Sequence, residues 1–377
     1  MVRNPFGAYC LDSNGFLISR RLVPIVVDCT RDRTDGSKEK PVAYVTIRDV
    51  AQRAGVSIAA VSQILHGKGR FSEETRRLVR ETVTEMGYVP DQRAQSMRSS
   101  GMKTVGLLVP DLRNPYFADL VSSMENRLYS HGVSTLIGTS AESVERQDVF
   151  IANLLGQRID GAIVVPQGVE TPGVCALVSA DLPVVFVDRR IEGLDSVPFV
   201  VSDPVPGTRA AVKELVRLGH RRIGYVSHPS LGSSSINERA TAFLSIAKEL
   251  LPDGHSVIVE CASTYASRRA ALDNLLAADV TAIICAYSPD MITLIGLLYD
   301  RGIEIGSGMS VISFDDIDEF TLMTPPVSVI SQQAQNMGSL GVDMLLERMA
   351  EPHANHDNGV RYVPTEFIAR QSIGAVA

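Results

Sequence analysis

The residues from Thr46 to His66, TIRDVAQRAGVSIAAVSQILH, have the spacing of two short amphipathic helices joined by a glycine turn. In the first helix, apolar side chains recur at i, i+3, i+4 and i+7, starting from Ile47. Thr46 is a favourable N-cap, and Asp49 stands where a carboxylate stabilises the helix N-terminus. Gly55 permits the tight turn, because glycine adopts backbone angles that strain other residues. The segment therefore predicts a helix-turn-helix unit.

The second helix is expected to begin after Ser57, a good N-cap, and to bury Val61, Ile64 and Leu65. Val56 precedes the cap and is placed to pack on Val61. In a helix-turn-helix, the opposite face of this helix lies in the major groove of DNA, and here it presents Ile58, Ala59, Ser62 and Gln63.

A third helix is predicted from Ser72 to Gly87, with Leu78, Val79 and Met86 as its apolar positions. Helix pairs with a glycine turn also occur in proteins that never bind DNA, but the charge distribution favours DNA. Residues 45–103 hold ten Lys or Arg against six Asp or Glu, a net charge of +4. Residues 104–377 hold nineteen against thirty-two, a net charge of −13. The basic side chains available to phosphates are Arg48, Arg53, Lys68, Arg70, Arg76 and Arg77.

The length of 377 residues suits two or three domains. No apolar run approaches the roughly 18 to 20 residues of a membrane span, so we expect no membrane contact, and the scattered, unpaired cysteines favour a cytoplasmic location. Residues 1–44 lack helical or strand periodicity and the features of a signal peptide, and we expect them to be disordered, peripheral or upstream of the natural start. No metal or cofactor is expected, and reduced, mostly buried thiols are predicted for Cys10, Cys29, Cys175, Cys261 and Cys285.

From Lys103 onward, short β-branched runs alternate with amphipathic helices. Buried parallel strands are predicted at 104–110, 161–166, 183–188, 221–227, 281–287 and 309–316. Helices are predicted after the cap Asn114 and near 143–156, 207–218, 238–251 and 334–349. We therefore expect a small all-α helix-turn-helix domain at 45–90, a linker at 91–102 and a two-lobed, doubly wound α/β domain at 103–377. Its first lobe is expected at about 103–202 and 332–361, and its second at about 203–331 and 362–377.

Sheets of this kind bind ligands beyond the carboxyl ends of their strands. The loops there carry Asp111, Asn114, Tyr116, Phe117, Asp188, Arg189, Asp315 and Asp316. Aromatic rings beside carboxylates, an amide and an arginine suit a polyhydroxylated ligand such as a sugar or a nucleoside. Each residue also has a simpler interpretation: Asn114 as a helix cap, Phe117 as core, and Asp188 with Arg189 as a surface ion pair.

Eight segments, in order, resemble the LacI/GalR family of transcriptional regulators over about residues 43–374: TIRDVAQRAGVSIAAVSQIL, FSEETRRLVRETVTEMGYVPDQRAQSM, NPYF, VDRR, LGHRRIGYVS, ERATAF, VISFDD and PPVSVISQ. The resemblance implies a homodimeric repressor whose heads bind a pseudopalindromic operator in double-stranded DNA. Hinge helices near residues 92–99 would fold in the minor groove, with Met97 where the family has a leucine wedge. The implied DNA contacts are Thr46, Arg48, Ser57, Ile58, Ala59, Ser62, Gln63, His66, Arg77, Arg93, Ala94 and Met97.

The resemblance also implies lobes like those of periplasmic sugar-binding proteins, which close on a small effector and thereby change operator affinity. The implied effector contacts are Asn114, Tyr116, Phe117, Asp188, Arg189, Arg239, Ser288, Asp315 and Gln332. Ser288 and Pro289 stand where the family commonly has an Asn-Asp pair, which makes a sugar a less secure expectation than the cleft itself. In the recognition helix, Ala60 and Gln63 replace a common threonine and arginine, and a glutamine favours adenine.

Two other classes of protein share this fold. A solute-binding protein for transport would have the same two lobes, but it needs export and has no use for a basic helical head. An enzyme would need a phosphate loop, a metal cluster or a nucleophile with its base, and the sequence has no GxGxxG, P-loop or GxSxG motif. His220 follows a helix-ending glycine and is expected to be structural rather than a catalytic base. We therefore expect a protein that is not an enzyme.

Overall fold

The computed structural model of the protein describes residues 45–65, 67–88, 103–229, 234–252, 254–352, 354 and 356–376. Its internal contacts divide the chain into two units, Met1–Asp91 and Gln92–Ala377. The predicted extension at 1–44 and the whole of the predicted linker at 91–102 lie outside the described residues, as do four implied DNA contacts, His66, Arg93, Ala94 and Met97. In the part of the chain that is described, no helix has the length and apolar character needed to cross a membrane.

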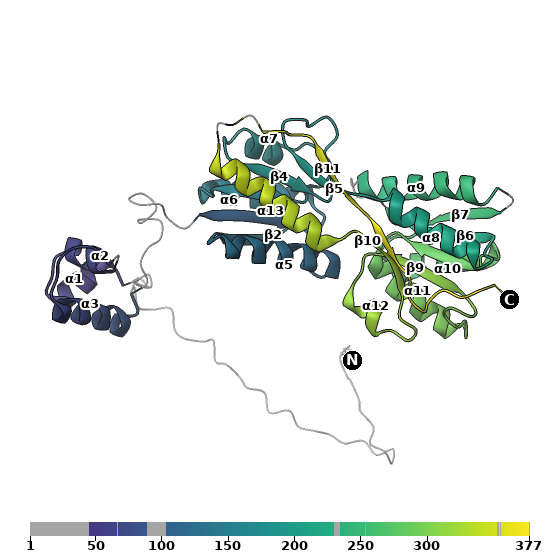
Figure 1. The fold of residues 1–377 in the computed structure, drawn as a ribbon, viewed down its shortest axis with the longest axis horizontal. Coiled ribbons are helices and arrows are strands. Elements are labelled where there is room, and N and C mark those ends of the chain that lie inside the picture. Colours follow the sequence, from purple (N-terminus) through teal and green to yellow (C-terminus); the bar gives the residue numbers. More distant parts are fainter. Residues whose placement is uncertain are drawn as a thin grey trace, which may run out of the picture. The chain divides into compact units, whose positions relative to one another are not determined.

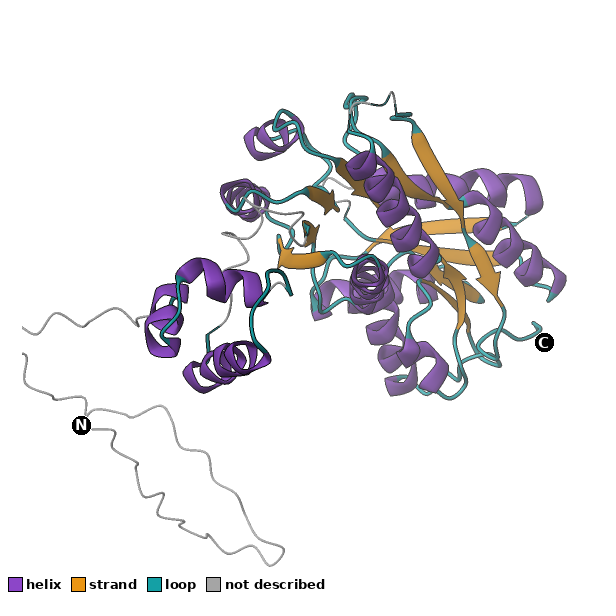
Figure 2. Ribbon diagram, turned by 60° about the vertical axis from the view of Figure 1, so that its left-hand side comes forward, coloured by secondary structure: helices purple, strands orange, loops and turns teal. Residues whose placement is uncertain are grey.

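The first unit is a three-helix domain made of α1 (Ile47–Ala54), α2 (Ile58–Leu65) and α3 (Glu73–Met86) (Figure 2). Its core consists of the buried side chains of Val50, Ala51, Ala54, Val61, Ile64 and Val79. The prediction for α3 was wrong at Leu78, which is 46% exposed. Thr82 and Val83 face the core instead, because a helix that buries Val79 brings positions i+3 and i+4 to the same side.

Local sequence signals define the ends of these helices. The N–H group of Thr46 donates to the Asp49 carboxylate at 2.7 Å, and the N–H group of Asp49 donates to the Thr46 hydroxyl at 3.4 Å, which is a capping box. Ser57 caps α2 by accepting from the N–H group of Ala60 at 3.1 Å. Gly55 ends α1 with a left-handed φ of 66°. The predicted helix-turn-helix therefore forms with its expected caps.

The second unit contains two six-stranded sheets (Figure 1). The sheet of lobe 1 has the order β11-β5-β4-β3-β1-β2 and is entirely parallel. Its strands are β1 (Thr104–Val109), β2 (Ser134–Thr139), β3 (Gly161–Val164), β4 (Val184–Val187), β5 (Phe199–Asp203) and β11 (Val360–Pro364). The sheet of lobe 2 has the order β12-β10-β9-β8-β6-β7, and only β12 is antiparallel to its neighbour. Its strands are β6 (Arg222–Ser227), β7 (His255–Glu260), β8 (Ala282–Cys285), β9 (Ser310–Phe314), β10 (Ser328–Ser331) and β12 (Glu366–Ile368).

Helices cover both faces of each sheet, as Figures 1 and 2 show. In lobe 1, α5 (Pro115–Ser130) and α13 (Ala334–Ala350) pack on one face, and α6 (Val144–Gly156) and α7 (Pro172–Val178) on the other. In lobe 2, the pairs are α8 (Val205–Arg217) with α9 (Ser234–Leu250), and α10 (Tyr265–Ala277) with α11 (Ser288–Asp300). A short helix, α12 (Asp318–Leu322), follows β9. The doubly wound architecture predicted from the sequence is confirmed.

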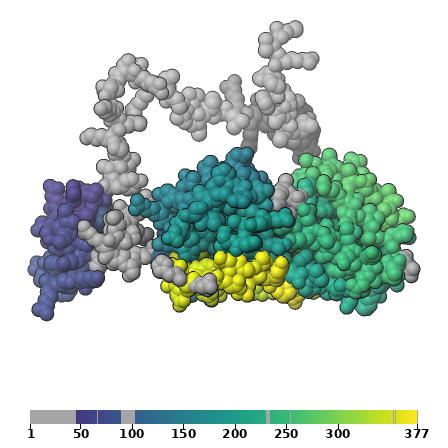
Figure 3. Space-filling view, turned by 90° about the horizontal axis from the view of Figure 1, so that it is seen from above, coloured from purple at the N-terminus to yellow at the C-terminus, as the bar shows by residue number. Residues whose placement is uncertain are grey.

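The chain crosses between the lobes three times: from β5 to α8, from β10 to α13, and from β11 to β12. The crossing segments are bonded to each other, since Thr365 donates its N–H group to the Asp203 carbonyl at 3.0 Å and accepts at its hydroxyl from the N–H group of Gly207 at 3.0 Å. A Cβ atom on Gly207 would lie 2.7 Å from the side chains of both Ile330 and Thr365. The three crossings therefore form one tightly packed hinge between lobes that lie side by side (Figure 3).

Candidate functional site

The exposed face of α2 is largely apolar at its N-terminal end. Ile58 is 45% exposed, and Ala59 and Gln63 are also exposed, whereas Ser62 is half-buried. Gln63 lies against the loop before α3, where a Cβ atom on Gly69 would come within 2.7 Å of its side-chain oxygen. Gly69 also has a φ of 80°, which favours glycine. The absence of a Cβ atom at Gly69 leaves room for the side chain of Gln63. This face offers apolar contact together with one amide.

The arginines of the three-helix domain differ in their contacts. Arg48 is exposed, and the side chain of Arg77 is 70% exposed, with a 3.6 Å ion pair to Glu81. Arg76, expected to be available to phosphates, is different: its side chain is only 17% exposed and donates to the Gly69 carbonyl at 2.7 Å. Arg76 therefore holds the loop before α3, whereas the other predicted phosphate contacts remain exposed, namely Arg48, Arg53, Lys68, Arg70 and Arg77.

In lobe 1, the predicted effector residues surround the carboxylate of Asp188. The hydroxyl of Tyr116 donates to Asp188 at 2.7 Å, and Asn114 caps α5 by accepting from the N–H group of Tyr116 at 3.2 Å. Arg189 forms two hydrogen bonds of 2.8 Å with Glu142. Asp188 and Arg189 are 3% and 7% exposed, so they are not the surface ion pair that was the simpler interpretation.

Phe117 belongs to the buried core of lobe 1, as the simpler interpretation had it. Its ring is also 5.7 Å from the guanidinium carbon of Arg189, and its neighbour Tyr116 packs edge-on at 5.1 Å. Phe117 therefore supports two of the effector residues from behind. Because it is only 5% exposed, it offers little area for direct contact with a ligand.

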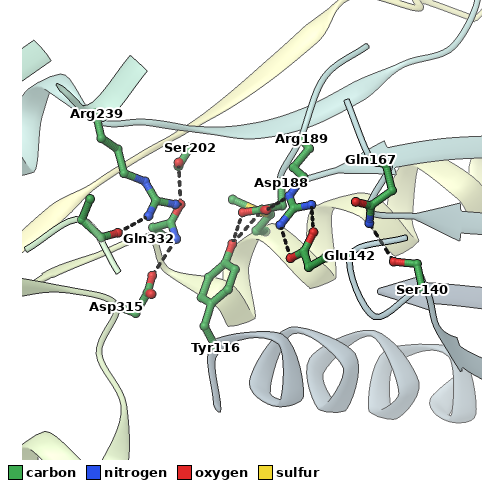
Figure 4. Close-up of polar contacts among 12 residues, drawn as sticks. Tyr116, Ser140, Glu142, Gln167, Asp188, Arg189, Ser202, Arg239, Asp315 and Gln332 are labelled. Carbon is green, nitrogen blue, oxygen red and sulfur yellow. Dashed lines mark hydrogen bonds and ion pairs between the residues drawn. The ribbon is translucent and has the colours of Figure 1, made fainter. Parts of the chain in front are cut away.

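In lobe 2, Gln332 connects the other predicted residues (Figure 4). Its amide nitrogen donates to Asp315 at 2.6 Å, and its oxygen accepts from Arg239 at 2.7 Å and from Ser202 at 2.8 Å. Ser288 donates to the second oxygen of Asp315 at 3.1 Å. Since Ser202 lies on β5 of lobe 1, Gln332 joins both lobes at the hinge.

Arg239 is held from three sides. Besides Gln332, it donates to the Ala286 carbonyl at 2.7 Å, and its guanidinium lies 4.8 Å from the ring centre of Phe314. Its Nε atom is buried without a hydrogen-bond partner among the described residues, as is the Nε atom of Arg189. A donor left unsatisfied in the interior costs free energy, so the Nε atom of Arg239 favours an acceptor that enters the site, whereas the Nε atom of Arg189 already lies 3.8 Å from the Asp188 carboxylate.

Burial sets the protonation behaviour of this cluster. The pKa of Asp315 is raised by burial, while Arg239 and the hydrogen bonds from Gln332 and Ser288 act in the opposite direction. The pKa of Tyr116 is raised well above 10, first by burial and then by the charges of Asp188 and Asp315. Tyr116 therefore remains a neutral hydrogen-bond donor.

The nine predicted effector residues form one buried set at the facing ends of the two sheets, each at most 7% exposed. Two partners were missing from the prediction, Glu142 and Ser202. Glu142 follows β2 and Ser202 lies near the end of β5, so both stand at the same sheet edge as the predicted residues. If β2 and β5 had been predicted as strands, the polar residues at their carboxyl ends would have been candidates as well.

A separate cavity of about 820 Å³ lies at the junction of the lobes. Residues 190–195 and 358–360 line it from lobe 1, and Ser234, Asn237 and Glu238 line it from lobe 2. None of the nine predicted effector residues lines this cavity. Arg190 and Glu238 form an ion pair across the junction, which joins the two lobes beside the cavity.

Comparison with known proteins identifies both parts of the chain. The model for bacterial regulatory proteins of the lacI family matches residues 46–91, and the model for the periplasmic binding protein-like domain matches residues 212–373. Catabolite control protein A from Priestia megaterium is 28% identical over 331 residues, which cover 87% of this chain and 99% of that protein.

Two solved structures have the same fold. A probable LacI family transcriptional regulator from Corynebacterium glutamicum is 28% identical, with a TM-score of 0.65, and the match covers 72% of this chain and all of that one (100%). The lac repressor dimer bound to operator and the anti-inducer ONPF is 24% identical, with a TM-score of 0.73 over 88% of this chain and 100% of that one. These matches confirm the resemblance and the fold class predicted from the sequence. The chain therefore carries a helix-turn-helix head of the lacI family of bacterial regulatory proteins, followed by a periplasmic-binding-protein-like domain.

Proposed function

We propose that this chain is a DNA-binding transcriptional repressor that binds a pseudopalindromic operator as a homodimer and responds to a small polar effector between its lobes. The observation that carries the proposal is the joining, in one chain, of a capped helix-turn-helix to a two-lobed domain with a buried polar set where its sheets face each other. The alternative of a transport solute-binding protein accounts for the lobes alone. The match of residues 46–91 to the model for the lacI family supports the repressor instead.

The exposed face of α2 is suited to bases that offer methyl groups or a paired donor and acceptor. Ile58 and Ala59 offer apolar contact to a thymine methyl group, and Gln63 has the donor and acceptor that match adenine. Arg48 and Arg77, together with the N-terminal end of α1 at Thr46, would contact phosphates and fix the register. Because few side chains on this face form hydrogen bonds, we expect DNA shape to supply much of the sequence preference.

The chemistry of the buried set favours a ligand with several hydroxyl groups. Asp188 and Asp315 are acceptors held by Tyr116, Gln332 and Ser288, and Arg239 has one unsatisfied donor beside them. A polyol would replace the hydrogen bonds that these groups now make with each other. The effector would thereby change the contacts of Gln332, which connects Ser202 of lobe 1 to Arg239 of lobe 2.

Coupling of this kind between two sites is typically worth about 1 to 3 kcal/mol, or roughly a 5- to 150-fold change in affinity. The test has two stages with the full chain. Selection from random double-stranded oligonucleotides at low salt should enrich a pseudopalindrome bound by two chains. Sugars, polyols and nucleosides are then added singly, and one should change the affinity for that sequence within the stated range. Binding without sequence preference, with and without these compounds, would contradict the proposal.

A further inference from the structure

Tyr287 lies two residues after the end of β8 and immediately before Ser288. Burial and then the charges of Asp290, Glu142, Asp315 and Asp111 raise the pKa of its phenol to about 12. Glu142 and Asp111 belong to lobe 1, whereas Asp290 and Asp315 belong to lobe 2. The phenol therefore lies where the two lobes face each other, and it stays protonated. Among the residues that the structure describes, none forms a hydrogen bond with its hydroxyl that would occupy this donor.

The ring of Tyr287 is backed by a second ring. His228, which follows β6, is 7% exposed, and its imidazole packs on the phenol with the ring centres 4.4 Å apart at an angle of 34°. The two rings come from neighbouring strands, since β6 pairs with β8 in the sheet. The phenol ring, backed by the tilted imidazole, makes an aromatic surface at the carboxyl end of the lobe 2 sheet.

A buried ionic cluster fixes the orientation of this surface. Nδ1 of His228 lies 2.7 Å from one oxygen of Asp290, and Arg268 donates to the other oxygen at 2.7 Å. Asp290 is 0% exposed. Burying such a cluster contributes little to stability, because the cost of desolvation offsets the attraction, so a fixed ring is its clearest effect. Among the described residues, Nε2 of His228 has one long contact of 3.4 Å, with the Ser263 hydroxyl.

The charges around this surface disfavour an anion. The charged groups around this surface include five carboxylates (Asp111, Glu142, Asp188, Asp290 and Asp315) and four guanidinium groups (Arg113, Arg189, Arg239 and Arg268). Three of the four arginines are already paired with a carboxylate, at 2.8 Å for Arg113, 2.8 Å for Arg189 and 2.7 Å for Arg268. A phosphate group would find little free positive charge here, whereas a neutral ring would find an aromatic face and a free hydroxyl.

We propose that Tyr287 and His228 form a subsite for a second, uncharged ring of the effector, beside the residues that hold its hydroxyl-bearing part. This inference rests on the proposed function, and it narrows the effector to a neutral molecule with two rings, such as a disaccharide or a nucleoside. Tyr287 supplies a ring face and a hydroxyl donor, and His228, held by Asp290, sets the tilt of that face. The subsite thereby selects the ligand by ring number and charge.

The test measures binding of single compounds to the full chain by calorimetry. Ribose and glucose serve as one-ring probes, cellobiose and adenosine as two-ring probes, and glucose 6-phosphate as the charged probe. At least one two-ring probe should bind more tightly than the one-ring probes and the phosphate. Tyr287→Ala should weaken the two-ring probe about tenfold, while one-ring binding changes by less than about twofold. Tyr287→Phe, which keeps the ring, should retain most of the affinity, and His228→Asn should give an intermediate loss.

Tyr129→Ala is the matched control, because Tyr129 is 76% exposed at the far end of α5 from the cleft. It should leave all affinities unchanged. The subsite is wrong if Tyr287→Ala leaves two-ring binding intact, if it weakens both kinds of probe equally, or if the wild type prefers one-ring probes. Preference for one-ring probes would contradict the subsite but not the effector site. Failure of the wild type to bind any probe would overturn the effector site and the subsite together.

Discussion

At the scale of single residues, Gln63 and Arg77 have different surroundings and should have different effects on DNA binding. Gln63→Ala removes the amide from the exposed face of α2, and we expect it to cost about 1 to 3 kcal/mol at one base position while relaxing the preference there. Arg77→Ala should weaken binding to all sequences about equally and lower the salt dependence by about one unit of slope. Binding to all single-base variants of the selected sequence, at several salt concentrations, distinguishes the two results.

An equal loss on every sequence from Gln63→Ala would show that the base-contacting face is misplaced. Arg80→Ala is the control, because Arg80 is exposed on α3 and is not among the basic side chains expected to contact phosphates. Its effect should be smaller than that of Arg77→Ala.

His220 should make the stability of the second unit depend on pH. Its Nε2 atom lies 3.0 Å from the Gly374 carbonyl and must donate, so Nδ1 accepts from the Thr281 hydroxyl at 2.8 Å in the neutral form. Burial lowers the pKa of His220 below its ordinary value of 6.5. The unfolded chain therefore takes up a proton near pH 6.5 that the folded chain does not. The stabilisation is present above that pH and is lost as the pH falls toward the folded-state pKa.

Urea unfolding between pH 8 and pH 5 measures this dependence. His220→Asn should flatten the fall in unfolding free energy on the acid side, although it also lowers stability at pH 8 by removing a buried hydrogen bond. His255→Asn, at an exposed position on β7, is the control and should keep the wild-type pH profile. An unchanged profile for His220→Asn would contradict the assignment.

At the scale of secondary structure, burial explains only part of which strands could be predicted, because the interior strands β5 and β10 are also buried and were missed. The interior strands β1, β3, β4, β6, β8 and β9 have nearly every residue buried, and their continuous apolar runs were predicted as strands. The edge strands β2 and β7 are mostly half-buried or exposed, so STLIGT and HSVIVE lack such runs. Because β2 was not predicted, Glu142, the partner of Arg189, was also missed.

The cleft shows the same limit. Asp188 and Asp315 follow interior strands and were predicted, because a polar residue directly after an apolar run is visible in the sequence. Their hydrogen-bond partners were not all predictable, since Gln332 meets Ser202 only where two crossings of the chain come together. Contacts between segments 130 residues apart depend on the packing of the whole lobe, which local spacing does not encode.

Substitution by alanine should change the free energy of unfolding in opposite directions at two glycines, one just after a helix and one inside a helix. Gly132 follows α5 with a φ of 69°, and a Cβ atom there would meet nothing within 4 Å, so Gly132→Ala should cost about 1 to 2 kcal/mol of unfolding free energy through backbone strain alone. Gly296 lies inside α11, is exposed and is equally free of neighbours within 4 Å. Gly296→Ala should stabilise by about 0.5 to 1 kcal/mol, because alanine favours the helix.

Urea denaturation of the two variants, followed by circular dichroism, compares them under one set of conditions. Each serves as the control for the other, because both add one methyl group to open space. A stabilising effect of Gly132→Ala would contradict the left-handed conformation at that residue.

At the scale of the whole molecule, the ion pair between Arg190 and Glu238 should favour the closed arrangement of the lobes. It joins the end of β4 in lobe 1 to α9 in lobe 2, with side chains 34% and 29% exposed. A pair this exposed is worth about 1 kcal/mol or less, so Glu238→Gln should lower effector affinity by at most about fivefold. Small-angle scattering without effector should show a larger radius of gyration for this variant.

Glu214→Gln is the matched control, because Glu214 pairs with Arg217 inside α8 and spans no junction. It should leave both effector affinity and the radius of gyration unchanged. Equal effects of the two substitutions would show that the Arg190 pair does not act on the arrangement of the lobes.

The division of the chain into segments is also a property of the whole molecule. The sequence predicted two lobes, each built from separate segments, with the last crossing from lobe 1 to lobe 2 near residue 361. In the structure β11 continues to Pro364, and the return to lobe 2 is at Thr365. The difference of a few residues matters little for the fold. It does place Thr365, rather than a surface loop, in contact with Asp203 and Gly207 at the hinge.

The pairing of β11 with lobe 1 and of β12 with lobe 2 has a consequence for the synthesis of the protein. Both sheets receive an edge strand from residues 360–368, and Ser372 and Val376 then bond to β9 and to the end of α8. A ribosome that has translated nine tenths of the chain has therefore completed neither lobe, although the three-helix head left the exit tunnel long before. Domains generally fold as units during synthesis, N-terminal first. A stalled or truncated chain would thus present a finished DNA-binding head on a body that cannot respond to a ligand.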